Sequence, residues 1–223
     1  MSQIEIEIKS LLGEKSKAEK LISDLSGKGF DLNNIKKSSQ LNHYFTYSDL
    51  EKFKQVFGEI VLNKEEFNNI LEKGSNFSIR TRETNSTKVI LVIKASLGED
   101  SSQNGVSRLE FEEVLPMSLQ ELDDKLLGCG LEYQAKWSRA REEYKKDNMT
   151  VCIDKNAGYG YLAEFETVTE NEGEVEKVKN ELVNFMNELG VEELKQDRLE
   201  RMFDFYNKSW PDYYGTDKIF LVE

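Results

Sequence analysis

Apolar and polar residues alternate with a period of two along several stretches of the chain, a pattern typical of half-buried β-strands. In the first example three isoleucines occupy one face of the strand, and Glu5, Glu7 and Lys9 occupy the other. Alternation and β-branched content together predict strands over residues 3–10, 40–47, 77–84, 88–97, 105–115, 131–144, 148–155 and 161–169.

Apolar residues three or four positions apart predict amphipathic helices between and after these strands. Gly27 and Gly29 mark the end of the first helix, and Gly190 marks the end of a later one. The spacing predicts helices over residues 14–28, 118–127, 175–189 and 192–206, with short helical pieces inside 49–73.

Charged residues dominate the polar faces of the predicted strands, with few of the serines and threonines that a solvated face usually contains. For one strand alone, a face turned to water is the simpler interpretation. Acidic and basic pairs, however, lie on separate strands and meet only if the sheet closes. The like-facing charged residues are Glu5, Glu7 and Lys9; Arg80 and Arg82; Lys94; Arg108, Glu110 and Glu112; Arg139 and Arg141; Asp154; and Glu164 and Glu166.

These patterns predict an α+β fold, in which a closed antiparallel β-barrel has a charged interior and helices cover its apolar exterior. No repeat or linker divides the chain, so residues 1–223 are expected to form one domain. Its barrel covers about 3–170, C-terminal helices about 173–208, and an aromatic tail 209–223. We favour packing of the tail on the barrel exterior; closure of one barrel mouth and a homodimer contact are the alternatives.

A charged interior costs several kcal/mol for each unpaired ion, so it requires a ligand. Clustered carboxylates repel one another unless a cation lies among them, and oxygen ligands suit Mg²⁺ or Mn²⁺. Arginines match phosphate oxygens with two hydrogen bonds. A divalent metal bound to several phosphates satisfies both halves of such a cavity.

Lys+Arg 30 against Asp+Glu 42 gives a net charge of −12, which disfavours nucleic acid and anionic membranes as partners. No apolar stretch is long enough for a transmembrane helix, and the N-terminus lacks a secretory pattern. Cys129 and Cys152 are interpreted as reduced core thiols, and the single His43 as a structural or rim residue. These features predict a cytoplasmic protein.

The strand motifs resemble the CYTH superfamily, also called triphosphate tunnel metalloenzymes, which includes class IV adenylyl cyclases and thiamine triphosphatases. Residues 5–9 resemble its ExExK signature. The arginine pair at 80–82, the Lys94 strand, and the segments 108–112, 139–144 and 154–166 follow in the order of the family. Two departures are Arg139, where lysine is common, and Thr46, where aspartate is common.

The resemblance implies an eight-stranded antiparallel tunnel that uses Mg²⁺ or Mn²⁺. It assigns the metal to Glu5, Glu7, Glu164 and Glu166, with Asp154, Glu110 and Glu112 as further candidates. It assigns phosphate contacts to Lys9, Arg80, Arg82, Lys94, Arg139 and Arg141, and we add Arg108 from its position on the same face.

We hypothesise hydrolysis of a terminal phosphoanhydride in tripolyphosphate or an organic triphosphate, with Glu5, Glu7, Lys9 and Glu166 as catalytic residues. Glu7 or Glu166 would orient and deprotonate the attacking water. The alternatives are an adenylyl cyclase, which uses the same tunnel on the α-phosphate, and a non-catalytic triphosphate-binding module. An RNA 5′-triphosphatase is weaker, because no basic track for a chain is evident.

Overall fold

The computed structural model describes residues 4–96, 107–169 and 171–221, apart from the side chains of residues 107, 108 and 172. All eight predicted strand segments form strands within this range. Strand residues 3, 97, 105 and 106 of the sequence prediction lie outside the described residues. The strands are β1 (Ile4–Gly13), β2 (Lys36–Thr46), β3 (Ser75–Thr84), β4 (Lys88–Ser96), β5 (Ser107–Leu115), β6 (Glu132–Lys146), β7 (Met149–Asn156) and β8 (Gly160–Thr169).

The helices also follow the predicted pattern, and the segment 49–73 divides into two of them. In the described ranges, no helix combines the length and apolar character needed to cross a bilayer. The helices are α1 (Lys15–Gly27), α2 (Glu51–Ile60), α3 (Lys64–Lys73), α4 (Leu119–Gly128), α5 (Val175–Glu188) and α6 (Gln196–Ser209), with 3₁₀ turns η1 (Glu172–Glu174) and η2 (Trp210–Asp212).

One helix start was predicted wrongly. The last helix begins at Gln196 rather than at residue 192, because the chain just before it is bonded to β1. The amide of Leu194 donates a 2.7 Å hydrogen bond to the carbonyl of Lys9, and the Leu194 side chain is buried. A bond to a neighbouring strand therefore replaces the first helical turn.

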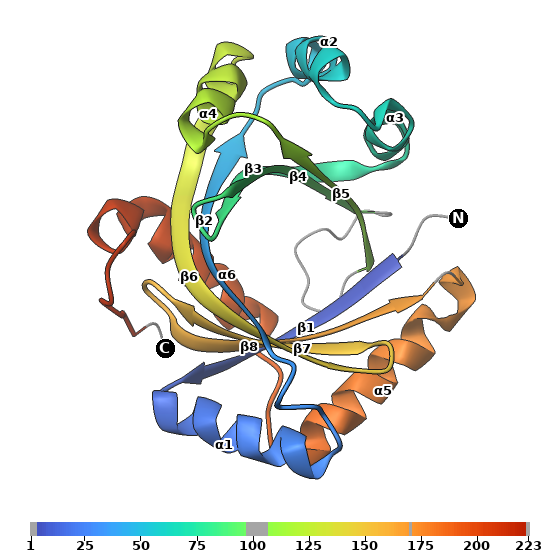
Figure 1. The fold of residues 1–223 in the computed structure, drawn as a ribbon, viewed down its shortest axis with the longest axis vertical. Helices are drawn as coiled ribbons and strands as arrows, with labels where there is room; N and C mark the ends of the chain where they lie inside the picture. Colours follow the sequence, from blue (N-terminus) through green and yellow to red (C-terminus); the bar gives the residue numbers. More distant parts are fainter. Residues whose placement is uncertain (1–3, 97–106, 170, 222–223) are drawn as a thin grey trace.

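The strands form one antiparallel sheet in the order β1-β5-β4-β3-β2-β6-β7-β8, the order of a closed barrel. The closing seam between β1 and β5 is short, with register pairs Glu5–Arg108 and Ile6–Ser107. Figure 1 shows the strands arranged in a ring, with α1 and α5 below it and α2, α3 and α4 above it. The predicted α+β fold with an eight-stranded antiparallel sheet is confirmed.

Most of the hydrophobic core lies outside the ring, and a third apolar cluster around α6 packs on Trp137 and Leu162, which share a strand face with the interior charges. In β1 the buried residues Ile4, Ile6 and Ile8 alternate with partly exposed Glu5 and Glu7, so the apolar face turns outward toward helices. Two clusters cover the outer faces: α1 and α5 pack on β1, β7 and β8, and α2, α3 and α4 pack on β2 to β5. Burial of each large apolar side chain contributes about 1.5–3 kcal/mol. The exterior therefore supplies most of the stability, and the central part of the interior is left for polar groups.

The C-terminal segment is held against the barrel at several points. The Tyr206 ring of α6 stacks on Trp137 of β6 with ring centres 3.5 Å apart. The Tyr214 hydroxyl lies 2.8 Å from Nε2 of His43, whose Nδ1 lies 2.6 Å from the fully buried Asp123 of α4. The interpretation of His43 as a structural residue is confirmed.

Candidate active site inside the barrel

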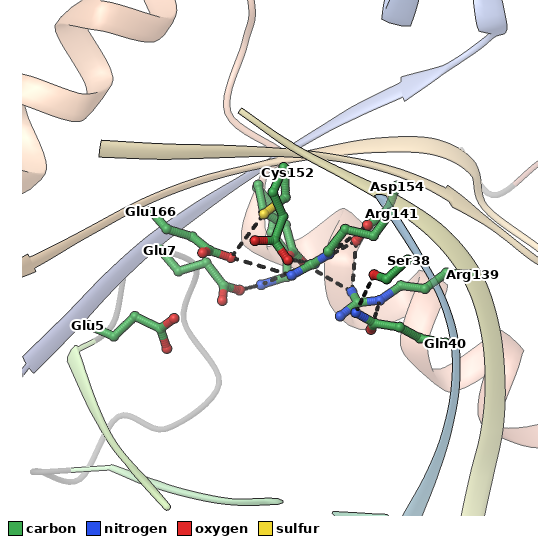
Figure 2. A network of polar contacts seen from close by, with 12 residues as sticks. Glu5, Glu7, Ser38, Gln40, Arg139, Arg141, Cys152, Asp154 and Glu166 are labelled. Carbon is green, nitrogen blue, oxygen red and sulfur yellow. Dashed lines mark hydrogen bonds and ion pairs between the residues drawn. The ribbon is translucent and has the colours of Figure 1, made fainter. Parts of the chain in front are cut away.

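Three carboxylates from adjacent strands meet inside the barrel. Glu5 and Glu7 come from β1, and Glu166 of β8 is the register partner of Glu7. One oxygen from each side chain lies within 4.8 Å of the other two, and all three side chains are partly buried. In Figure 2 they extend toward the same space. Carboxylate oxygens so placed are suitable ligands for a hard cation such as Mg²⁺ or Mn²⁺.

The members of this acidic cluster, Glu5, Glu7 and Glu166, differ in how well their charge is tolerated. Burial and the negative charge of Glu164 raise the pKa of Glu166 to about 7. Burial also opposes the charge of Glu5, but Lys94, 2.7 Å away, outweighs it and lowers the pKa of Glu5. Glu166 is therefore the carboxylate whose ionisation a bound cation would favour most.

The raised pKa of Glu166 predicts that metal binding stabilises the protein more as the pH rises. The pKa of Glu166 in the folded protein, about 7, exceeds the ordinary value of 4.5. The stability that this group contributes is therefore complete below about pH 4.5 and is lost as the pH rises through about 7. A bound cation needs the ionised form and reverses that loss. Mg²⁺ or Mn²⁺ should thus raise the melting temperature more at about pH 8 than at about pH 6. An equal or smaller rise at the higher pH, measured calorimetrically, would contradict the assignment.

A second carboxylate pair comes from β5. Glu110 lies 3.3 Å from Lys94, yet burial raises the pKa of Glu110 to about 7 against the attraction of that lysine. Glu112 accepts a 2.7 Å hydrogen bond from Arg82; burial opposes its charge, but Arg82 outweighs burial and lowers its pKa. Lys94 therefore lies between this pair and the acidic cluster, bonded to both.

Two arginines of β3 point into the barrel, and the positive charge of Arg82 is incompletely neutralised. Arg80 donates a 2.6 Å hydrogen bond to the Tyr44 hydroxyl, but among the described residues nothing accepts a bond from its buried Nε. Burial and the positive charge of Arg80 lower the pKa of Arg82 to about 10. Like charges crowded in this way would be relieved by a bound anion.

The arginines of β6 are engaged differently. Arg139 and Arg141 each donate 2.7 Å hydrogen bonds to Asp154, which is fully buried behind them on β7 (Figure 2). Arg141 also forms a short ion pair with Glu164. Burial opposes the charge of Glu164, but Arg141 outweighs it and holds the pKa of Glu164 well below its usual range. Asp154 therefore holds both arginines in position and lies away from the acidic cluster.

A cavity of about 650 Å³ connects these groups. Lys9 lies on its wall, paired with Glu7 and 3.9 Å from Glu164. Arg108 pairs with Glu5 through the backbone, and its side chain lies outside the described residues. The predicted residues on the wall are Glu5, Glu7, Lys9, Arg80, Arg82, Lys94, Glu110, Glu112, Arg139, Arg141, Glu164 and Glu166.

Residues of β2 complete the site and were missed from the sequence. Gln40 accepts a 2.8 Å bond from Nε of Arg139, and Asn42 accepts a 3.0 Å bond from Nε of Arg82. Burial opposes ionisation of Tyr44, but Arg80 outweighs it and lowers the pKa of Tyr44 to about 8. These three residues occupy every second position of β2, and this polar spacing in the sequence could have predicted that they face the interior.

A family model for the CYTH domain matches residues 3–199. The chain belongs to the CYTH domain family. The resemblance drawn from the strand motifs is thereby confirmed. No curated protein sequence matches this CYTH chain.

Solved structures share the fold of this CYTH protein at low sequence identity. The PH1819 protein of Pyrococcus horikoshii OT3 is 20% identical with a TM-score of 0.60, over 86% of this chain and 93% of that chain. A "putative adenylate cyclase" of Vibrio parahaemolyticus is 13% identical with a TM-score of 0.58, over 86% and 91%. A chain of the Schizosaccharomyces pombe Mediator head module is 12% identical with a TM-score of 0.50, over 85% and 95%. Such identities show a common fold alone.

Proposed function

We propose that this CYTH protein hydrolyses the terminal phosphoanhydride of a triphosphate, with a divalent cation bound by Glu5, Glu7 and Glu166. The observation that supports this most is the meeting of a three-carboxylate cluster with buried, crowded arginines on the wall of one cavity. A cation alone would leave the crowding of Arg80 and Arg82 unrelieved, and a simple anion would be repelled by the glutamates. A metal-bound polyphosphate neutralises both sets.

The basic residues of the cavity would bind the phosphates, at different positions relative to the metal site. Arg80 and Arg82 would bind phosphate oxygens, since Arg80 has a buried Nε to donate and Arg82 gains from a nearby anion. Lys94 and Lys9, which already touch carboxylates, would lie between the phosphates and the metal site. Cationic groups held in place in this way stabilise the charge that spreads over the phosphoryl oxygens during transfer.

The acidic cluster fits a hard cation, because its donors are all carboxylate oxygens and Glu166 resists ionisation without one. When bound, Mg²⁺ or Mn²⁺ would lower the charge of the phosphates and acidify a water molecule. Glu166, holding the cation through one carboxylate oxygen, would be ionised and would accept the proton of the attacking water on the other. The water oxygen would bond to the terminal phosphorus as the anhydride bond to the neighbouring phosphate breaks. The diphosphate part of the substrate would be the leaving group, and the terminal phosphoryl group would be released as inorganic phosphate.

Product analysis tests the proposal directly. ATP and tripolyphosphate would each be incubated with the protein and Mg²⁺ or Mn²⁺, and the products separated. Release of inorganic phosphate supports hydrolysis. Cyclic AMP with pyrophosphate would instead establish the cyclase alternative. The chain shares its fold with the Vibrio structure described as a "putative adenylate cyclase". Tight binding with no product at all would leave a triphosphate-binding module.

Substitution of Arg80 by alanine should weaken triphosphate binding far more than phosphate binding. Its guanidinium is buried between Tyr44 and Glu110 and crowds Arg82, so it serves a ligand with several charges. We expect a loss of about tenfold or more in tripolyphosphate affinity, from one charge-assisted contact. Calorimetric titration of tripolyphosphate and of phosphate would measure it. Arg201→Ala on the exposed side of α6 is the control, and equal losses for both ligands in Arg80→Ala would contradict a multi-phosphate site.

A further inference from the structure

Strand β2 differs from its neighbours in the charge of its inner face. The inward-facing side chains from residue 38 to residue 44 are Ser38, Gln40, Asn42 and Tyr44, which include no carboxylate, lysine or arginine. Among the described residues, each of the other seven strands brings a charged side chain to the interior. In the sheet β2 lies between β3 and β6, each with a pair of inward-facing arginines. A strand without formal charge therefore separates two basic strands.

Three polar side chains of β2 each accept a hydrogen bond from the arginine opposite them in the sheet. The register pairs are Gln40–Arg139, Asn42–Arg82 and Tyr44–Arg80. The acceptor is an amide oxygen for Arg139 at 2.8 Å and for Arg82 at 3.0 Å, and a phenol oxygen for Arg80 at 2.6 Å. Gln40 and Asn42 are buried, and Figure 2 shows Gln40 directed at Arg139. The contacts thus repeat at every second position of β2, where all three arginines reach the cavity wall.

An uncharged acceptor orients a guanidinium without cancelling its charge. Arg82 and Arg139 each already donate to one carboxylate, Glu112 or Asp154. A second carboxylate on β2 would outnumber the positive charge of either arginine, whereas an amide oxygen leaves that charge unchanged. A guanidinium has five N–H groups, so one bond to β2 leaves others for a ligand.

Arg141 provides the contrast within the same barrel. Its register partner on β2 is Ser38, whose hydroxyl instead accepts a 3.2 Å bond from Gln40. The hydrogen bonds of Arg141 among the described residues go to the carboxylates of Asp154 and Glu164. Arg141 is therefore held by negative charge, and the arginines opposite the amides of β2 keep more of their charge for a ligand.

We propose that Gln40, Asn42 and Tyr44 are positioning residues, which orient the arginines of β3 and β6 through uncharged acceptors and so preserve the positive charge that a triphosphate requires. They act through the arginines rather than on the reacting atoms. The inference rests on the proposed function, because preserved charge matters for a ligand with several negative charges. It adds a requirement to that function: β2 must hold the arginines without a carboxylate.

The first test replaces Asn42 by aspartate, which keeps the acceptor for Arg82 and adds a negative charge. With Mg²⁺ or Mn²⁺, Asn42→Asp should raise KM for tripolyphosphate about tenfold or more, the strength of repulsion between charges in a partly buried site. Its melting temperature should equal or exceed that of wild type, because a carboxylate favours the charge of Arg82, which burial and Arg80 oppose. Asn68→Asp, exposed on α3, adds the same charge outside the cavity and should change neither value.

A second variant at this position removes the acceptor. Asn42→Leu has nearly the same shape, but the Nε of Arg82 then has no acceptor on β2. It should raise KM for tripolyphosphate and also lower the melting temperature, because a buried donor without a partner is destabilising. The two variants therefore change affinity in the same direction and differ in stability. A merely structural acceptor would instead be replaced by aspartate without loss of affinity.

Gln40→Glu makes the equivalent change beside Arg139 and should also raise KM about tenfold. Gln55→Glu, exposed on α2, is its control and should leave KM unchanged. Affinity is measured as KM where phosphate is released, and as the calorimetric Kd of tripolyphosphate where it is not. Inorganic phosphate, titrated in the same way, should lose less affinity than tripolyphosphate because it carries fewer charges.

The outcomes separate this inference from the proposed function. If wild type cleaves tripolyphosphate and either Asn42→Asp or Gln40→Glu binds it as tightly as wild type does, the positioning role of β2 is overturned and hydrolysis stands. A melting temperature of Asn42→Asp well below that of wild type also overturns it. If wild type binds tripolyphosphate without releasing phosphate, hydrolysis is overturned, and a loss of affinity in these two variants but not in their controls supports the role of β2. If wild type neither binds nor cleaves tripolyphosphate or ATP, both are overturned.

Discussion

Glutamine at position 166 is expected to remove metal-dependent turnover while making the metal-free protein more stable. The charge of Glu166 is disfavoured in the fold, since burial and Glu164 raise its pKa to about 7. Glutamine keeps the shape of the side chain and relieves that repulsion, so the melting temperature at about pH 8 should rise without metal. Loss of one ligand of the acidic cluster should lower kcat about a hundredfold or more. Phosphate release and calorimetric melting would measure the two effects.

Glu132→Gln is a suitable control, because Glu132 is exposed at the start of β6 and does not line the cavity. It should change neither turnover nor stability. Retained activity in Glu166→Gln would reject its place in the metal site. A lower melting temperature without metal would show that the carboxylate is stabilised by its neighbours rather than strained by them.

Alanine at position 141 is expected to destabilise the fold strongly. Arg141 joins two carboxylates, Asp154 and Glu164, in the barrel wall. Burial opposes the charge of Arg141, but Glu164 and Asp154 outweigh it and raise its pKa. Without Arg141, the fully buried Asp154 retains only Arg139 among its described ionic partners. Breaking a buried ion pair on one side typically costs about 3–5 kcal/mol.

Such a loss corresponds to a fall of roughly 10 °C in melting temperature for a protein of this size. Urea unfolding at neutral pH would give the free-energy change. Lys155→Ala offers a contrast on the same strand as Asp154, because Lys155 pairs with Asp217 in solvent and should cost about 1 kcal/mol or less. Similar small effects for both variants would mean that the Arg141 pairs do not stabilise the barrel, and would assign that arginine to ligand binding alone.

Much of the fold could be predicted from local patterns. The alternation in β1 placed three isoleucines on one face and charges on the other, and the structure has the same alternation of buried and partly exposed residues. The start of α6 could not be predicted, because Leu194 is held by a hydrogen bond to Lys9, a residue distant in the chain. Local propensity carries no information about such a partner.

The sequence predicted which residues belong to the site better than it predicted which of them form ion pairs with one another. The sequence grouped Asp154 with the metal carboxylates, whereas the structure places it against Arg139 and Arg141 and fully buried. The register between β6 and β7 sets this arrangement, and register is a property of paired strands.

By itself the sequence determined which side chains face the interior, because in an extended strand consecutive residues point to opposite sides. It also determined which charged groups the interior contains, since glutamates and arginines occupy the alternating positions of the strands. The tertiary structure alone decided which charges neutralise one another and which remain for a ligand. Ion pairing depends on distances of a few ångströms between strands, and only the closed arrangement of the sheet sets those distances.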